Sequence, residues 1–595
     1  MNYRAKNLTI FVVLFGVIGI LFFYITTLLA ISLISGHSKA ITILTKYHIT
    51  EQYITLWKYF EYYWQVWWKY RSQLSLESNN YFVLKLRIAS FLPSGILLLI
   101  FFIFRAPIID FRPFKPKEKI HGDARWASHK EIKKIGLRSK HGMLLGKDKK
   151  GFLIADGFQH CLLFAPTGSG KGVGFVIPNL LFWTDSVIVH DIKLENYELT
   201  SGYRHNKLKQ RVFLWNPADP GGVSHCYNPI DFVSRKMGQM VDDVQKIANL
   251  LLPEQEFWQN ESRSLIVGII LYLIADDSKV KTFGEVVRTL RNDDVVYNLA
   301  VVLDTMGKDI HPVAYMNIAA FLQKADKERS GVISTANSSL ELWANPLIDA
   351  TTARSDFDIR TFKKIPTTVY VGLTPDNIQR LQPLMKIFYQ QASQALSSRM
   401  PTKEDKVGVM FVMDEFPTLG KMEQFQTGIA YFRGYKVRLF LIIQDTEQLK
   451  GTYEEAGMNS FLANSTYRIT FAANNVETAN LISQLIGNKT VNQESLNKPK
   501  FFDLNPASRS LHVSETQRAL LLPQEVINLP RDDQILLIEA SPPIKSKKIK
   551  YYEDKFFKKR LLKQVTIPTQ DPIIPGKNSA PPQQEQPPEG IAEGG

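Results

Sequence analysis

Cysteine is almost absent from this chain, which has only Cys161 and Cys226 among its 595 residues. Two cysteines so far apart lack the close spacing of a metal-ligand set, and nothing suggests a disulfide-linked scaffold. Cys161 lies in a short apolar run, where a thiol packs as a small hydrophobic group. This scarcity argues against a cysteine-ligated metal site and against an oxidised, disulfide-rich domain.

Acidic residues are too few to balance the basic ones. The chain has 57 Asp and Glu against 72 Lys and Arg, which gives a formal net charge of +15. Such a surplus favours anionic partners, namely nucleic acid, phospholipid headgroups or acidic proteins. The charge alone does not choose among them, because many membrane proteins have basic cytoplasmic loops.

Long uncharged apolar runs are lacking after residue 119, but two occur before it. Residues 8–35 carry no charge, and about 28 residues rising ~1.5 Å each exceed a hydrocarbon core of ~30 Å, so they can span it with tilt. Residues 88–104 form a second run near the lower length limit, with Lys85 and Arg87 expected to snorkel at its outer end. The sequence thus predicts a membrane anchor over residues 1–119.

The pattern after residue 120 is that of an α/β domain. Apolar strands alternate with helical segments over residues 120–235 and 356–560, which predicts a mostly parallel, doubly wound sheet. Strand-like runs nearly vanish over 236–355, where helical periodicity predicts an all-α insertion. Residues 561–595, rich in Pro, Gln, Gly and Glu, are expected to be disordered. The expected strands include Cys161–Phe164, Ser186–His190, Val212–Leu214, Thr368–Leu373, Val409–Met413, Leu439–Ile443, Arg468–Phe471 and Gln534–Glu539.

A Gly-rich loop that ends in Gly-Lys follows the first of these strands. Backbone N–H groups of such a loop surround phosphates, Lys171 neutralises their charge, and the following helix N-terminus adds its dipole. Two usual residues are missing: Ala165 stands where the first glycine is expected, and Gly172 stands where Ser or Thr would hold Mg²⁺. The expected nucleotide-binding residues are Ala165, Pro166, Thr167, Gly168, Ser169, Gly170, Lys171, Gly172 and Asp191.

Two adjacent carboxylates, Asp414 and Glu415, end the apolar strand Val409–Met413. An Asp at a strand end can hold Mg²⁺ through water, and the adjacent Glu can act as general base on the attacking water. Asp191 also follows a strand and is a rival metal acid, but it lacks an adjacent Glu. It is assigned a supporting role in the same crevice, because the carboxyl ends of parallel strands converge there.

Gln444 and Arg433 are further candidates around the strand Leu439–Ile443. Gln444 ends it and can sense the γ-phosphate or position water, although an ordinary polar cap is an alternative. Arg433 precedes it and can act as an arginine finger on a neighbouring subunit, but a surface arginine is an equal alternative. Arg329, Arg354 and Arg468 compete for that role. The expected catalytic set is Lys171, Asp414, Glu415, Gln444 and Arg433, with Asp414 as the metal-binding residue.

The orientation of the spans depends on flanking charges and on the nucleotide site. Arg4 and Lys6 precede the first span and several basic residues follow the second, which places both ends in the cytoplasm. The connecting loop is also basic, so the supply of ATP decides: a nucleotide site after the second span must face the cytoplasm. Aromatic residues such as Trp57, Phe60 and Trp64 predict a loop helix at the outer interface or a docking surface for membrane subunits.

This combination of features resembles the type IV secretion coupling proteins of the TraG/TraD type, which are related to RecA-like and FtsK-like motors. The resemblance covers roughly residues 1–545. It rests on His-Gly-Asp-Ala-Arg-Trp-Ala at 121–127, the phosphate loop and its helix at 165–174, Val-Ile-Pro-Asn-Leu at 176–180, Asp-Ile-Lys-Leu-Glu at 191–195, Asp-Glu-Phe-Pro at 414–417, and Gln444.

The resemblance implies a fold, two cofactors and residue roles. The fold is a RecA-like phosphate-loop NTPase sheet domain with an inserted all-α domain, preceded by two transmembrane helices. The cofactors are ATP and Mg²⁺, with Lys171 on ATP, Asp414 and Glu415 on metal and water, and Gln444 sensing the nucleotide. The family pattern has glycine where this chain has Leu194, so the turn after Asp191 departs from it. Gly172 is usual for this branch.

The implied function is an inner-membrane coupling ATPase that works as a homo-hexamer with other type IV secretion subunits. Its cargo would be protein effectors or a relaxase–single-stranded DNA complex, which the all-α domain would contact. One alternative is an FtsK-like DNA translocase, although that class has more spans and a DNA-reading winged-helix end. The other is an ATP-binding membrane assembly factor without turnover, which the missing hydroxyl at Gly172 keeps open.

Overall fold

The computed structural model of the chain describes residues 122–496 and 511–574, together with Val17. Apart from Val17, the expected spans 8–35 and 88–104 and the loop between them lie outside the described residues, as does the tail from residue 575. Among the described residues, no helix combines the length and the apolarity needed to cross a membrane.

One large sheet organises the described residues, with strand order β2-β1-β13-β12-β9-β3-β8-β7-β4-β6-β5. The strands from β9 to β5 run parallel, whereas β12, β13, β1 and β2 pair antiparallel with their neighbours. The strands are β1 Met143–Asp148, β2 Gly151–Ala155, β3 Cys161–Phe164, β4 Ser186–Asp191, β5 Arg211–Trp215, β6 Thr367–Gly372, β7 Val409–Met413, β8 Val437–Ile443, β9 Tyr467–Thr470, β12 Asp533–Ile538 and β13 Ile544–Lys547; β10 Asn488–Leu496 and β11 Leu511–Ala519 form a separate hairpin.

Both faces of the parallel strands are buried, as a doubly wound sheet requires. Leu162 and Phe164 of β3 belong to one hydrophobic core, whereas Cys161 and Leu163 belong to the other. Because side chains alternate along a strand, the continuous apolar run of β3 supplies both cores. The helices outside the insertion are α6 His129–Lys134, α7 Ile177–Phe182, α8 Glu195–Asn206, α16 Ile378–Ser397, α17 Glu423–Gly428, α18 Thr446–Asn464, α19 Val476–Ile486, α20 Pro523–Ile527 and α21 Lys555–Lys558.

The α/β sheet with a helical insert is confirmed, but the sheet is mixed rather than mostly parallel at one side. The strands β1, β2 and β13 were not expected. In β13, Ile544 and Ser546 are buried, whereas Lys545 and Lys547 are exposed. Because lysines occupy one face of this short strand, it lacks the continuous apolar run that predicts a buried strand.

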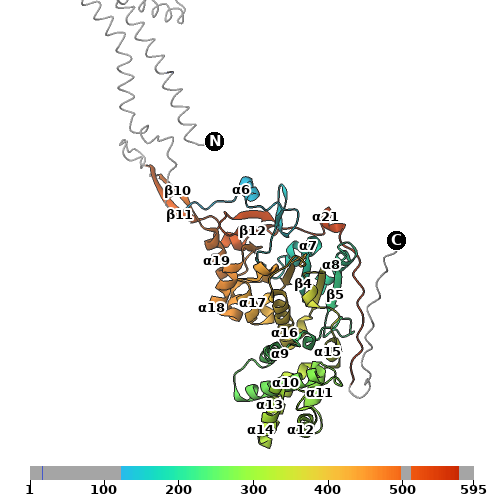
Figure 1. The fold of residues 1–595 in the computed structure, drawn as a ribbon. Coiled ribbons are helices and arrows are strands. Elements are labelled where there is room, and N and C mark those ends of the chain that lie inside the picture. Colours follow the sequence, from blue (N-terminus) through green and yellow to red (C-terminus); the bar gives the residue numbers. More distant parts are fainter. Residues whose placement is uncertain (1–16, 18–121, 497–510, 575–595) are drawn as a thin grey trace, which may run out of the picture. The chain divides into compact units, whose positions relative to one another are not determined.

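The helical insert lies between β5 and β6, and Figure 1 shows it as the green and yellow-green helices at the lower end. Residues 265–274 of one helix, α10, are buried without interruption, so this helix is the core of the insert. The insert helices are α9 Met237–Leu251, α10 Phe257–Ala275, α11 Phe283–Leu290, α12 Val295–Met306, α13 Pro312–Leu322, α14 Asp326–Ser339 and α15 Pro346–Thr351.

Residues 561–574, here called the C-terminal strap, were assigned to the disordered tail but are held against the sheet domain. The Tyr197 hydroxyl of α8 donates to the carbonyl of Val565. The Gln570 N–H donates to the carbonyl of Gly222 at 2.8 Å. The strap also has six Leu, Val or Ile residues, of which Ile567 is buried in a hydrophobic core with Val565 packed against that core, so apolar contacts and hydrogen bonds together hold it. The Pro- and Gln-rich residues that follow dominate the composition of 561–595, which is why the whole segment reads as disordered from its sequence.

Candidate active site

The phosphate loop, residues 165–172, leaves the sheet between β8 and β9. The Ala165 N–H donates to the carbonyl of Ile443 at 2.9 Å, so the loop starts at the carboxyl edge of the sheet. Gly168 and Gly170 have φ of +76° and +83°, a left-handed conformation that costs other residues energy. Among the described residues, no atom apart from those of their chain neighbours lies within 4 Å of where their Cβ atoms would be. The loop therefore has the backbone and the open space of a phosphate cradle.

The helix after the loop begins with wide turns. Lys171 has helical dihedral angles, a π-helix follows over Gly172–Val176, and α7 continues it. Single π-helical turns are rare and are found mostly at functional sites. The N-terminus that was expected to face phosphate is thus present, in an unusual helical form.

Lys171 lies between the two carboxylates that end β7. Its Nζ is 2.8 Å from Oδ1 of Asp414 and 2.8 Å from Oε1 of Glu415. Burial lowers the pKa of Lys171, but the two carboxylates more than offset this and leave it above its ordinary value. Burial raises the pKa of Asp414, and the ammonium of Lys171 offsets this only in part. Residues separated by more than 240 positions thus form one charged cluster.

The backbone of Glu415 is strained. Its φ of +49° and ψ of 47° are left-handed, which is uncommon for a residue with a side chain. The Thr418 N–H and hydroxyl donate to the Glu415 carbonyl at 2.9 and 2.8 Å and hold this turn. Strain of this kind persists only where the surroundings enforce it, and it is concentrated at functional sites.

The donor set fits Mg²⁺ and a nucleotide. Oδ1 of Asp414 is buried and receives no hydrogen bond of good geometry, so its only partner within the described residues is the charge of Lys171. The Ser169 hydroxyl in the loop is also buried without a hydrogen bond. Carboxylate oxygens suit Mg²⁺, which usually takes one or two of them and completes its shell with phosphates and water. At Gly172, the nearest atom to the position of a Cβ is Oε2 of Glu195, 4.0 Å away.

Asp191 ends β4 and is 1% exposed. Its Oδ2 accepts the Tyr197 N–H at 2.8 Å, and its Oδ1 accepts the Asn196 side-chain amide at 3.0 Å. Burial raises its pKa to about 7, although these hydrogen bonds act in the opposite direction, and the charge of Asp414 raises it further. Asp191 therefore lies near the carboxylate pair, but its oxygens are occupied by the start of α8.

The turn after Asp191 takes the conformation for which glycine is suited. Leu194 has φ of +58°. This left-handed conformation is the one that glycine adopts most easily, but here leucine adopts it. The replacement of the expected glycine by Leu194 therefore changes the side chain and keeps the turn.

Gln444 lies at the same edge of the sheet as the loop. It follows β8, whose last residue Ile443 is the register partner of Phe164 at the end of β3. It is partly exposed, and its side chain forms no hydrogen bond within the described part of the chain. The structure thus places it beside the start of the phosphate loop.

Arg433 is not brought to the phosphate loop of its own chain. It is exposed in the 3-10 helix Phe432–Tyr435, which precedes β8. Burial, Arg438 and Arg433 together lower the pKa of His160, the residue before β3, to about 4. Arg433 therefore lies at the amino edge of the sheet, away from the phosphate loop at the carboxyl edge.

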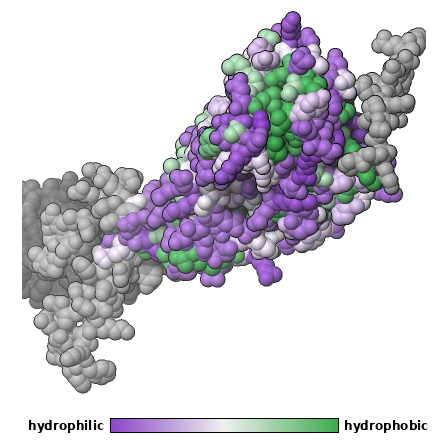
Figure 2. All heavy atoms as spheres, turned by 90° about the horizontal axis from the view of Figure 1, so that it is seen from below, coloured by the Kyte–Doolittle hydropathy of each residue, from purple (hydrophilic) through white to green (hydrophobic). Residues whose placement is uncertain are grey.

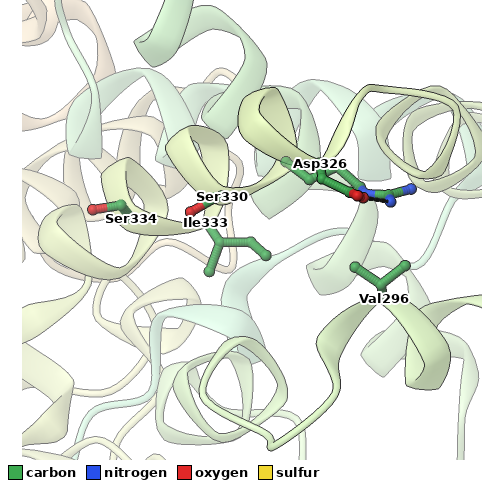
Figure 3. Close-up of a pocket in the computed structure, with 6 residues that line it drawn as sticks. Val296, Asp326, Ser330, Ile333 and Ser334 are labelled. Atoms are coloured by element: carbon green, nitrogen blue, oxygen red, sulfur yellow. Dashed lines mark hydrogen bonds and ion pairs between the residues drawn. The ribbon is translucent and has the colours of Figure 1, made fainter.

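The competing arginines also lie away from the loop. Arg468 is in the middle of the β3–β9 pair, opposite Leu162, and Arg354 forms an ion pair with Asp356 at 3.0 Å. Arg329 is in the helical insert, paired with an aspartate of its own helix. It lines a pocket of about 390 Å³ between α12 and α14, drawn in Figure 3, together with Val296, Asp326, Ser330, Ile333 and Ser334.

Lys548, which follows β13, also reaches the phosphate loop, although its sequence context gives no sign of this. Its Nζ donates to the backbone carbonyl of Ser169 in the phosphate loop at 3.0 Å. No local motif marks this lysine, because it lies in a charged stretch far along the chain from the loop. Lys548 could have been predicted only if β13 had been recognised as a strand that ends at the same edge of the sheet as the phosphate loop.

The described residues resemble known proteins in sequence. Residues 125–573 match the protein family described as type IV secretory system conjugative DNA transfer. Protein VirD4 of Rhizobium radiobacter is 33% identical over 476 residues, which cover 77% of this chain and 68% of VirD4. Conjugal transfer protein TraG of Escherichia coli is 30% identical over 514 residues, which cover 76% of this chain and 80% of TraG.

Solved structures show the same fold. The plasmid coupling protein TrwB, in complex with the non-hydrolysable ATP analogue ADPNP, matches with a TM-score of 0.54 at 17% identity, covering 73% of this chain and 96% of TrwB. TrwB in complex with ADP and Mg²⁺ matches with a TM-score of 0.52 at 16% identity and the same coverage. The resemblance inferred from the motifs is confirmed by the family match. The chain belongs to the type IV secretion coupling protein family.

Proposed function

We propose that this coupling protein is an inner-membrane ATPase that binds ATP and Mg²⁺ at the phosphate loop and uses hydrolysis to deliver substrates to a secretion channel. The observation that carries the proposal is the cluster of Lys171 with Asp414 and Glu415, both at 2.8 Å, beside an open Gly-rich loop. The TrwB structures solved with ADPNP and with ADP and Mg²⁺ support it at the level of the fold.

Each residue of the cluster has a separate task in this proposal. Lys171 leaves the carboxylates and neutralises phosphate charge, because a nucleotide presents more negative charge than the two side chains do. Asp414 is then free to hold the metal, which when bound neutralises charge that develops on the transferred phosphate. Glu415 accepts a proton from the attacking water, and Gln444 orients that water.

The active assembly in this proposal is a homo-hexamer with sites between subunits. Arg433 is exposed at the amino edge of the sheet and lies away from its own phosphate loop. An arginine finger supplied by a neighbouring subunit requires such exposure. Arg433→Ala is therefore expected to lower turnover in the assembled protein without weakening nucleotide binding by the isolated subunit.

The helical insert is proposed to contact the cargo, which is either protein effectors or a relaxase–single-stranded DNA complex. Figure 1 places the insert at the lower end of the molecule, and Figure 2 views that end and shows an apolar area within hydrophilic surface. An exposed cluster of large apolar side chains is typical of a protein interaction site. The exposed apolar residues of the insert are Met237, Phe257, Trp258, Val280, Tyr297, Val301, Tyr315 and Met316.

Phosphate release by the full chain in detergent tests the ATPase. We expect turnover in the unmodified protein, its loss in Lys171→Ala and Glu415→Gln, and no change in Lys327→Ala, a matched exposed lysine on α14. An unmodified protein that binds ATP but releases no phosphate would support the assembly factor without turnover. Equal rates in all four proteins would show that the site assignment is wrong.

The cargo can be identified with the same preparation. Stimulation of turnover by a single-stranded oligonucleotide, weakening as salt rises, favours a DNA–protein substrate, because phosphate contacts release counterions. Absence of stimulation, together with co-purification of secreted proteins, favours protein export. Exchange of Tyr297 and Met316 for serine is expected to reduce either interaction and to leave basal turnover unchanged.

A further inference from the structure

Lys548 places a second lysine against the phosphate loop, on the side opposite the carboxylates. The strand β13 runs antiparallel to β12, and β12 runs antiparallel to β9, so β13 ends at the same edge of the sheet as β3. In the strand order, β13 lies beyond β9 on one side of β3, whereas β7 lies beyond β8 on the other. The loop is therefore flanked by Lys171 with its carboxylates on one side and by Lys548 on the other.

The position of Lys548 is set by close packing. Lys548 is 7% exposed, and its backbone N–H donates to the carbonyl of Asp532 at 2.9 Å. The ammonium lies 4.1 Å from the centre of the Phe471 ring and donates to the Ser169 carbonyl at 3.0 Å. Gly174 packs closely beside it: a Cβ there would lie 3.3 Å from the Phe471 ring, a tight contact, and 3.6 Å from Cβ of Lys548, an ordinary one. The start of the helix after the loop, Phe471 and Lys548 are thus packed against one another.

No carboxylate of the described residues lies close enough to Lys548 to form an ion pair with it. The acidic residues that face it are Asp532 and Asp533, and both are already paired: Asp532 with Lys550 at 2.8 Å, and Asp533 with Lys545 at 3.4 Å as well as with Lys547. Within the described residues, Lys548 forms no ion pair of its own. A nearly buried cation beside a loop of inward N–H groups requires an anion for full stabilisation.

We propose that Lys548 is a second phosphate-site cation, which braces the loop through the Ser169 carbonyl and attracts the phosphates that a nucleoside diphosphate and a nucleoside triphosphate share. This inference rests on the proposed function of the loop. Because Lys548 lies on the side away from Asp414 and Glu415, it acts on binding and leaves the hydrolytic step to the carboxylates. Loss of its charge therefore weakens the binding of ADP and of ATP by the same factor.

Binding of ADP with Mg²⁺ to the full chain in detergent, with kcat and KM for ATP, tests this role. Loss of one charge-assisted hydrogen bond corresponds to a change of about tenfold in affinity. Lys548→Met is expected to weaken ADP binding and to raise KM for ATP by that factor, with kcat within about twofold. Lys548→Arg should retain most of the affinity. Lys545→Met, which changes an exposed lysine of the preceding strand β13, should leave ADP binding and KM unchanged. Unaltered ADP binding by Lys548→Met overturns the inference.

A pH series separates a charge effect from a packing effect. Burial lowers the pKa of Lys548 to about 8, against the opposing charges of Asp532 and Asp533 and with a contribution from Lys550. The ammonium form is thus lost between pH 7 and pH 9, and ADP affinity of the unmodified protein should fall more over this range than that of Lys548→Arg. Equal slopes contradict the inference, and this comparison holds even if Lys548→Met does not fold. Failure of the unmodified protein to bind ADP at any pH would instead refute the proposed function on which the inference rests.

Discussion

The ends of β4 and β7 look alike in sequence but do different things in the structure. β4 ends in Asp191 and β7 is followed directly by Asp414, both at the carboxyl edge of the same sheet. Asp191 gives both oxygens to Asn196 and Tyr197 at the start of α8. Asp414, after β7, keeps a buried oxygen without a hydrogen bond and faces Lys171. The two sites therefore differ in whether the carboxylate is available to a ligand. That availability depends on whether the N–H groups of the following residues bind to it.

The following residues explain this difference. After Asp191 the chain turns at once into α8, whose first N–H groups need acceptors, and the carboxylate supplies them. After Asp414 the left-handed Glu415 leads into the 3-10 helix Phe416–Leu419, which leaves the carboxylates facing the loop. We therefore call β4–α8 the structural junction, and β7 with its two carboxylates, where we propose that the chemistry occurs, the reactive junction.

The largest expected effect is at the reactive junction. Glu415→Gln removes the proposed general base but keeps the shape of the side chain, so kcat for ATP is expected to fall by roughly 10²–10⁴ while ATP still binds. Asp191→Asn, the corresponding change at the structural junction, should leave kcat within about fivefold. Single-turnover phosphate release on both variants measures this contrast, and a comparable loss of kcat in both would remove the distinction between the junctions.

The phosphate loop and the Asp-Glu strand could be predicted from the sequence because their chemistry is local. Gly168, Gly170 and Lys171 lie within a few residues of one another, and so do Asp414 and Glu415. The distinct role of Asp191 could not be predicted, because it depends on hydrogen bonds to α8. The approach of Lys548 to the loop depends on three antiparallel pairings at the side of the sheet, which leave no periodic signal near that residue.

The fold follows the same rule. Buried strands such as β3 are continuous apolar runs and were recognised, whereas the half-exposed β13 has lysines on its outer face and was not. The C-terminal strap has apolar residues, and Ile567 is buried in a hydrophobic core, but the Pro- and Gln-rich residues beyond it dominate the composition of 561–595. That composition indicated disorder for the whole segment, although core contacts and hydrogen bonds hold residues 561–574.

The second expected effect, on stability, is in α8, the helix that follows the structural junction. A Cβ on Gly202 of α8 would lie 2.0 Å from the carbonyl oxygen of Lys563 in the strap, so Gly202→Ala must displace that backbone. Overpacking of this kind costs about 1–3 kcal/mol, although alanine favours a helix. A lower melting temperature and faster tryptic cleavage at Lys563 would show it. The control is Gly238→Ala in α9, which has open space and should stabilise slightly.

A pH-dependent effect should separate the two aspartates further. Because the folded-state pKa of Asp191 is raised to about 7, the folded chain holds a proton there that the unfolded chain releases near pH 4. The stability from this carboxyl is full below about pH 4 and is lost as the pH rises through 7. Asp191→Asn removes this dependence, so its free energy of unfolding, measured at each pH, should rise relative to that of the unmodified protein between pH 5 and pH 8, by an amount on the order of 1–2 kcal/mol. A constant difference across that range would contradict the assignment.

The smallest expected effect concerns the hydroxyl that the phosphate loop lacks. If metal binding depends on Asp414, phosphates and water, restoring the usual residue with Gly172→Ser should change ATP turnover by no more than about threefold. The space is available, since only Oε2 of Glu195, at 4.0 Å, approaches the position of the new Cβ. Turnover measured across a Mg²⁺ titration decides the matter. A large gain at low Mg²⁺ would mean that Gly172 limits metal binding, so that the reactive junction alone does not hold the metal. An unchanged titration would show that Asp414 is sufficient, and that glycine at this position is compatible with full activity.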